Sequence, residues 1–254
     1  STPKPSSAAS DVYKRQGDGK MQPKQHPVLK WLGRVVFVLL IALSLALIFN
    51  EQIKSWLVSS YSPTVTTKSV AKNKKKAGNF DFTKVKSLDF QTVAKARLNK
   101  SAINVIGSIS IPSVELYLPI GKGGSNETLA LAAGTMKADQ TMGTGNYALA
   151  GHHMIKHGAL FSPLYYKSQV GQMIYLSDAK NIYAYRTSER TFIQATDLQV
   201  IDDVPGQKLV TLITCDKTGA GRLMIRGKYV QQWSFDQAPQ AVQKSFTSHF
   251  NNKY

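Results

Sequence analysis

The chain has 254 residues, a formal net charge of +17 at pH 7 and a single cysteine, Cys215. This length allows one or two domains. One cysteine excludes an internal disulfide, so the thiol is either a buried core residue or a reactive group. The positive charge lies largely in the N-terminal part and in a lysine-rich segment at 62–79.

The N-terminus reads as a leader followed by a basic segment. The chain begins at Ser1, and Met21 is followed at once by a basic stretch. We interpret residues 1–20 as a non-native or disordered leader and exclude them from functional argument. Residues 21–30 are predicted to form a basic cytoplasmic segment.

An apolar segment follows. Val35–Phe49 contains no charged residue, and Trp31, Leu32 and Gly33 extend it to about the 20 residues that cross a bilayer. We predict a transmembrane signal anchor over 31–50. A cleaved signal peptide is the alternative, but the run is long for one and lacks a small-x-small cleavage site.

Flanking charge predicts the orientation of this anchor. One acid and one base follow the span, whereas four basic residues lie just before it: Lys20, Lys24, Lys30 and Arg34. The positive-inside bias places the N-terminus in the cytoplasm and the rest outside, in a single-pass protein of the cell membrane.

Residues 51–79 are predicted to be a basic extracellular linker. The part at 62–79 holds five lysines and no acid. Such a cluster can bind nucleic acid, but no aromatic residue interrupts it to stack on bases. We therefore expect a solvated stalk near anionic headgroups or wall polymers, and no nucleic-acid partner.

Beyond the linker the pattern changes from helix to strand. A helix is predicted within Phe80–Leu98, with Ser87 as a plausible cap, and short helical turns at Glu127–Ala133 and Gly158–Tyr166. The short strands, with turns between them, favour an all-β barrel or sandwich. They are predicted at Ile106–Pro112, Val114–Ile120, Asn146–Gly151, Gln172–Ser177, Ile182–Arg186, Arg190–Ala195, Lys208–Cys215 and Arg222–Gln231.

The C-terminal segment, 233–254, is predicted to be an amphipathic helix and tail. Its apolar residues recur at intervals of four, which is typical of one helix face. They are Ala238, Val242, Phe246 and Phe250.

Three reactive side chains fall at predicted strand ends. Cys215 ends one strand, Arg222 begins the next, and His152 follows another. If the last two strands form a hairpin, Cys215 lies opposite Arg222, while Arg226 lies opposite Thr211, about 13 Å from the thiol. A thiolate nucleophile, an imidazole that moves protons and a guanidinium that offsets developing charge form a plausible active site.

Each of these residues has an alternative role. An isolated cysteine is more often a core residue, and Arg222 alone could be an exposed charge. His152, His153 and His157 suggest a metal site, but no carboxylate joins them, so we expect no metal and no cofactor.

The combination carries a family resemblance. Thr211-Leu-Ile-Thr-Cys215, with Arg222 after it and Leu-Ala-Gly-His152 before it, resembles the sortase family, class A, over residues 80–232. The resemblance implies that 80–232 is a catalytic domain with a closed eight-stranded β-barrel. It also implies cleavage of an LPxTG-type sorting signal between Thr and Gly through a thioester, and transfer to an amine of a peptidoglycan precursor of the lipid II type.

The same resemblance assigns residues. Cys215 would be the nucleophile, His152 the acid and base, and Arg222 the clamp on the substrate carbonyl. Ala150 and Thr214 would line the peptide groove, and 187–207 would be the loop that covers the signal. His153 is expected to be a packing or site-edge residue.

Two departures from relatives matter. Calcium-binding members use several acids near the second strand, whereas this chain offers Glu115 there, so we expect no calcium dependence. The chain ends in a polar helix, which favours the housekeeping class. The alternatives are a non-catalytic membrane-tethered barrel that binds wall polymers and an L,D-type cysteine transpeptidase.

Overall fold

The computed structural model describes residues 27–154, 159–216, 219–247 and 250, and it divides into two compact units, Ser1–Ile48 and Phe49–Tyr254. The expected leader at 1–20 and positions 21–26 of the basic segment lie outside the described residues. In the first unit, helix α1 covers Pro27–Ile48. Its stretch Lys30–Ile48 is long and apolar enough to cross a membrane, as expected for 31–50.

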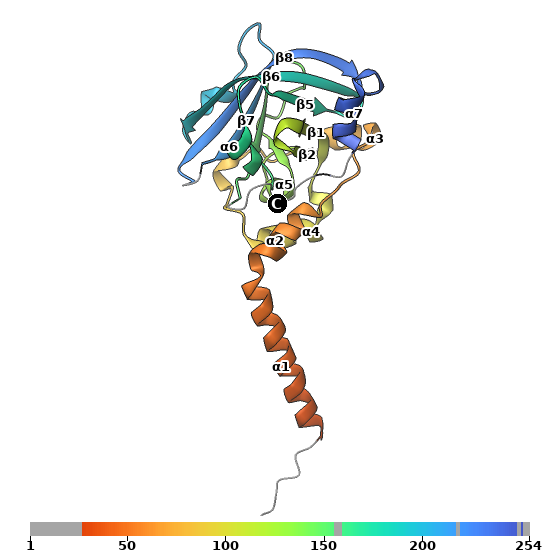
Figure 1. Ribbon diagram of the computed structural model, residues 1–254, viewed down its shortest axis with the longest axis vertical. Helices are drawn as coiled ribbons and strands as arrows, with labels where there is room; N and C mark the ends of the chain where they lie inside the picture. Colours follow the sequence, from red (N-terminus) through yellow and green to blue (C-terminus); the bar gives the residue numbers. More distant parts are fainter. Residues whose placement is uncertain (1–26, 155–158, 217–218, 248–249, 251–254) are drawn as a thin grey trace, which may run out of the picture. The chain divides into compact units, whose positions relative to one another are not determined.

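The second unit is built on eight strands that close into a barrel in the order β1-β2-β3-β4-β7-β8-β6-β5. Figure 1 labels β1, β2, β5, β6, β7 and β8 of this barrel. Neighbouring strands are antiparallel except for the β2–β3 and β4–β7 pairs, which are parallel. This confirms the closed eight-stranded barrel. The strands are β1 Val105–Ile111, β2 Leu116–Gly121, β3 Ala133–Thr135, β4 Asn146–Gly151, β5 Met173–Ser177, β6 Asn181–Gln194, β7 Leu209–Cys215 and β8 Gly221–Ser234.

Alternate side chains of these strands fill the barrel interior, as the two-residue period of a strand requires. The interior cluster is almost entirely aliphatic and aromatic, and it includes Ile109, Leu118, Leu149, Leu176, Tyr185, Leu212 and Ile225. Leu164 and Val114 in this cluster come from helical segments. Short helices precede, connect and follow the strands. They are α2 Asn50–Ser59, α3 Thr67–Lys74, α4 Phe90–Leu98, α5 Asn126–Leu131, α6 Ser162–Lys167 and α7 Gln240–Thr247, with 3-10 turns η1 Phe82–Lys84, η2 Lys100–Ala102, η3 Pro112–Val114, η4 Leu198–Ile201 and η5 Phe235–Gln237.

The structure differs from the expected linker at 51–79. This stretch forms α2 and α3, and Val58, Tyr61 and Val70 in it are buried. Val58 and Tyr61 join a second apolar cluster with residues of α4 and β1. The prediction of a solvated stalk was wrong because the lysines dominate the composition, whereas the apolar residues between them decide the packing.

The amphipathic C-terminal helix is present as α7, shorter than the expected 233–254 because β8 continues to Ser234. Of the four regularly spaced apolar residues, Val242 and Phe246 lie in α7 and Ala238 and Phe250 flank it. All four are buried, in a cluster with Tyr117 and Ile182. The Tyr117 hydroxyl donates a hydrogen bond to the Phe246 carbonyl at 2.5 Å.

Several other boundaries differ from those predicted. The strands expected at 182–186 and 190–195 are one strand, β6, with register shifts between Ala184 and Tyr185 and between Thr187 and Glu189. The covering loop is therefore shorter than the expected 187–207, because 187–194 belongs to β6. The three-residue strand β3 has no counterpart among the predicted strands, since a run this short shows no alternation.

Candidate active site

The hairpin of β7 and β8 has the predicted register. Cys215 pairs with Arg222, and Thr211 pairs with Arg226. Directly opposed residues of an antiparallel pair have Cα atoms about 4.5–5.5 Å apart and side chains on one face. Cys215 and Arg222 are therefore neighbours, and both are partly exposed.

Strand β4 ends beside Cys215, and His152 follows its last residue. β4 runs parallel to β7, with Ala150 beside Ile213 and Gly151 beside Thr214. The next position in this register places His152 next to Cys215, and adjacent strands lie about 4.8 Å apart. On the far side, Ile193 of β6 pairs with Arg222. The row across four strands is thus His152, Cys215, Arg222 and Ile193.

This row lies on the outer face of the barrel. Leu212, three residues before Cys215, and Leu223, directly after Arg222, belong to the interior cluster, and alternation turns Cys215 and Arg222 the other way. The next row on the outer face is apolar: Ala150, Ile213 and Met224. These three side chains form an apolar surface next to Cys215, which we call the apolar floor. Ile213 and Met224 were not singled out by sequence reasoning. Alternation along β7 places Ile213 on the face of Cys215, and the register adds Met224 beside it.

Thr214 lies elsewhere. It is 3% exposed, on the opposite face of β7 from Cys215, and its hydroxyl donates a hydrogen bond to the Gly151 carbonyl at 2.8 Å. Of the two expected groove residues, the structure brings Ala150 to the face of the thiol and uses Thr214 to fasten the end of β4 to β7.

Local packing fixes the backbone of His152. A Cβ at Gly151 would lie 2.5 Å from Cγ of Phe161, so only glycine lets this ring pack there. The Phe161 N–H then donates a hydrogen bond to the His152 carbonyl at 3.0 Å. His152 is partly exposed, yet the surrounding protein lowers its pKa to about 4 by burial. The imidazole is therefore neutral at pH 7 and able to accept a proton.

His153 is held by stacking. Its ring lies 4.8 Å from the Tyr165 ring with an angle of 13° between the planes. Its Nδ1 lies 3.4 Å from the carbonyl oxygen of Asp216, just after the thiol. These contacts fit the expected packing role at the edge of the site.

The guanidinium of Arg222 contacts the turn that joins β7 to β8. Its Nη1 donates hydrogen bonds to the carbonyls of Gly219 and Gly221, each at 2.9 Å. The Asp216 carboxylate accepts a hydrogen bond from the Gly221 N–H at 3.1 Å and closes the same turn. To bind a substrate carbonyl, the guanidinium has to exchange at least one of these partners.

The loop at 195–208 is fastened by residues that sequence reasoning did not assign to it. Nη2 of Arg226 donates a hydrogen bond to the Val200 carbonyl at 3.0 Å, and Nη1 lies 3.3 Å from Glu189. The buried amide of Asn146 donates to the carbonyls of Val200 and Asp202. These contacts join segments more than 25 residues apart, so no local pattern signals them.

Among the residues that the structure describes, no group of three His, Cys, Asp or Glu side chains could hold a metal ion. His157 lies outside those residues. Glu115, the candidate calcium ligand, pairs with Lys167 at 2.5 Å. Two cavities of about 270 and 190 Å³ are lined by other residues.

A β-barrel that presents a thiol beside a neutral imidazole and a guanidinium defines an enzyme of the cysteine-nucleophile class. Comparison with known proteins gives the family. A sequence model described as the Sortase domain matches residues 109–230. Sortase A of Streptococcus agalactiae is 35% identical over 239 residues, which cover 90% of this chain and 96% of the relative.

Sortase A of Listeria monocytogenes is 38% identical over 191 residues, covering 73% of this chain and 85% of the relative. The crystal structure of a Listeria monocytogenes sortase A covers 57% of this chain and 98% of its own, with a TM-score of 0.53 and 38% identity. The chain belongs to the sortase family, whose members are cysteine transpeptidases that anchor surface proteins to the cell wall.

Proposed function

We propose that this enzyme cleaves LPxTG-type sorting signals between Thr and Gly, with Cys215 as nucleophile, His152 as acid and base, and Arg222 as carbonyl clamp. The observation that carries the proposal is the register that sets Cys215 opposite Arg222 and leads β4 to His152 beside them. The family places sorting-signal proteins and cell-wall precursors among the substrates.

The first half-reaction forms a thioester. The neutral imidazole of His152 accepts the Cys215 proton, and Sγ adds to the carbonyl carbon of the Thr–Gly bond. Arg222 donates hydrogen bonds to the carbonyl oxygen as negative charge develops on it. The C–N bond then breaks, and the imidazolium gives its proton to the departing glycine amine.

The second half-reaction reverses the roles. An amine of a peptidoglycan precursor of the lipid II type loses a proton to His152 and attacks the thioester carbonyl. The C–S bond breaks, and the thiolate of Cys215 recovers the proton from the imidazolium. The new amide bond joins the surface protein to the precursor, and the enzyme returns to its starting state.

The apolar floor suits the sorting signal. Ala150, Ile213 and Met224 form an apolar strip beside the thiol. The loop at 195–208 is held near this strip by the hydrogen bonds that Arg226 and Asn146 donate to the Val200 carbonyl. The leucine and proline of an LPxTG motif would lie on this strip. In this proposal Ala150 contacts the peptide directly, while Thr214 supports the groove through its bond to Gly151.

We also propose the cellular arrangement. Helix α1 crosses the cell membrane once, with the N-terminus in the cytoplasm and residues 49–254 outside. The support is the apolar stretch Lys30–Ile48 and the basic residues before it. The two alternative functions, a non-catalytic barrel that binds wall polymers and an L,D-type transpeptidase, are set aside because the chain belongs to the sortase family.

The test uses a fluorogenic LPxTG-type peptide with the full chain, with and without an amine acceptor. We expect cleavage that requires Cys215 and a ligated product that appears only with the amine. The same peptide with its Thr–Gly bond replaced should not react. Cleavage at another bond, or equal cleavage by Cys215→Ala, would contradict the proposal.

A further inference from the structure

The second unit carries its excess positive charge at one end of its sequence. We call residues 50–102, which contain α2, α3 and α4, the helical cap. The cap has eleven Lys or Arg and three Asp or Glu, whereas residues 103–254 have fourteen and ten. A surface with this imbalance attracts anionic partners.

The cap also exposes large apolar side chains. Trp56 on α2 is 63% exposed and Leu98, the last residue of α4, is 89% exposed, although α2 and α4 pack on each other through buried Val58 and Val93. Tryptophan is enriched where protein meets the boundary between bilayer and water. Trp56 therefore suits a lipid surface better than bulk water.

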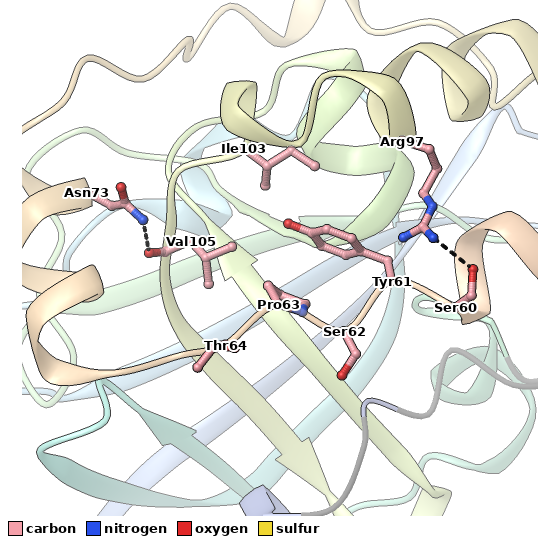
Figure 2. Close-up of a pocket in the computed structure, with 9 residues that line it drawn as sticks. All are labelled: Ser60, Tyr61, Ser62, Pro63, Thr64, Asn73, Arg97, Ile103 and Val105. Carbon is pink, nitrogen blue, oxygen red and sulfur yellow. Dashed lines mark hydrogen bonds between the residues drawn. The ribbon is translucent and has the colours of Figure 1, made fainter.

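A cavity of about 270 Å³ lies within the cap (Figure 2). Its lining has four hydroxyl-bearing residues in the segment after α2 and the guanidinium of Arg97, but no Asp or Glu: Ser60, Tyr61, Ser62, Pro63, Thr64, Asn73, Arg97, Ile103 and Val105. Nη2 of Arg97 donates a hydrogen bond to Ser60 Oγ at 3.1 Å, and its guanidinium carbon lies 5.9 Å from the centre of the Tyr61 ring.

The charge of the cavity is positive at neutral pH. Burial raises the pKa of Tyr61 to about 12, so its phenol stays neutral. Arg97 supplies a guanidinium to the lining together with the hydroxyl groups of the segment after α2, and guanidinium groups bind phosphate through paired hydrogen bonds. The cavity thus has the chemistry of a phosphate site.

The chain keeps this cavity close to the bilayer. α2 begins at Asn50, two residues after the apolar span ends at Ile48, and Ser60 follows α2 directly. Ten helical residues extend about 15 Å, whereas the headgroup layer is about 5–8 Å thick. An α2 that lies along the membrane surface therefore keeps the cavity at the depth of the lipid phosphates, whereas an upright α2 lifts it above them.

We propose that the helical cap binds the anionic lipid surface of the membrane, with a lipid phosphate in the Arg97 cavity and Trp56 in the headgroup layer. This proposal rests on the proposed insertion of α1. Lipid binding would add a second attachment beside the span and limit how the barrel tilts over the membrane.

The test uses the full chain with Trp31→Phe and Trp233→Phe, which leaves Trp56 as its only tryptophan. The protein is reconstituted in vesicles of phosphatidylcholine, with or without phosphatidylglycerol, and quenching by brominated lipid is measured. We expect stronger quenching with phosphatidylglycerol. One arginine near an anionic surface contributes about 1 kcal/mol, so Arg97→Gln should lower the ratio of docked to free cap about fivefold.

Arg97→Lys should keep most of the quenching, because the charge remains. Arg186→Gln, which removes an exposed arginine from β6, is the matched control and should change nothing. Equal quenching in both vesicles, or equal losses for Arg97→Gln and Arg186→Gln, would overturn the proposal. So would release by inorganic phosphate, beyond the effect of chloride at the same ionic strength. Peptide cleavage in the same vesicles reports the proposed function separately.

Discussion

Cys215 on β7 and Arg222 on β8 are directly opposed in one antiparallel hairpin. The turn between them is closed by Asp216 and by the guanidinium of Arg222 itself. The residue proposed to bind the substrate carbonyl thus also fastens the turn beside the nucleophile. Two properties of the Arg222 side chain, its positive charge and the paired N–H donors of its planar guanidinium, can be separated by substitution.

Arg222→Lys retains the charge but loses the paired donors, so we expect turnover to fall by the 10²–10³ typical of one lost oxyanion donor. Arg226→Lys is the matched control, four residues along the same strand. It loses the bond to the Val200 carbonyl, so it should raise KM and leave kcat close to that of the parent. Steady-state kinetics on the sorting peptide decide this, and a larger kcat loss for Arg226→Lys would reverse the assignment.

The two adjacent histidines should differ strongly. His152→Ala removes both proton transfers and should reduce kcat/KM by about 10²–10⁴. His153→Ala removes a ring that stacks on Tyr165, so it should lower thermal stability and cost much less activity. Both variants are compared by peptide cleavage and thermal unfolding. The opposite ranking in activity would mean that His153 moves the proton.

Much of this site could be predicted before the fold was known. The strand ends at Cys215 and Gly151 were predicted to the residue, because apolar runs end there. The pairing of Cys215 with Arg222 followed from symmetric closure of a short turn. Local pattern and local geometry suffice for contacts between neighbouring strands.

The rest depends on contacts between distant segments. The family resemblance places Thr214 in the peptide groove, whereas strand alternation from Cys215 turns its side chain to the opposite face of β7. The hydrogen bond from Arg226 to the Val200 carbonyl depends on the path of the loop at 195–208, which the periodicity of the sequence does not predict. The buried side of α2 and α3 was missed because lysines outnumber the few apolar residues that pack.

The low pKa of His152 predicts a pH dependence of stability. The unfolded chain protonates this imidazole near its ordinary pKa of 6.5, whereas the folded protein does so near 4. Between these values the unfolded state binds more protons, so the free energy of unfolding should fall as pH drops from about 6.5 towards 4. Denaturant unfolding of the parent and of His152→Gln across this window should show a shallower slope in the variant. Equal slopes would show that burial does not disfavour the charged imidazole.

Calcium should have little effect on activity. Glu115 is paired with Lys167 and Asp203 with Lys137, and calcium needs six to eight oxygen ligands. Sorting-peptide cleavage should be the same with added millimolar calcium and with a chelator. A several-fold activation by calcium would mean that oxygen ligands were overlooked.

The most direct test of the central claim is to trap the acyl-enzyme. The full chain is mixed with an LPxTG-type peptide without an amine, quenched in acid and examined by intact mass and peptide mapping. We predict one added acyl group, ending at the threonine of the signal, on the fragment that contains Cys215. It should disappear when hydroxylamine or an amine acceptor is added, and it should be absent from Cys215→Ala. Turnover without a hydroxylamine-sensitive adduct on Cys215, or an adduct on another residue, would contradict the thioester mechanism.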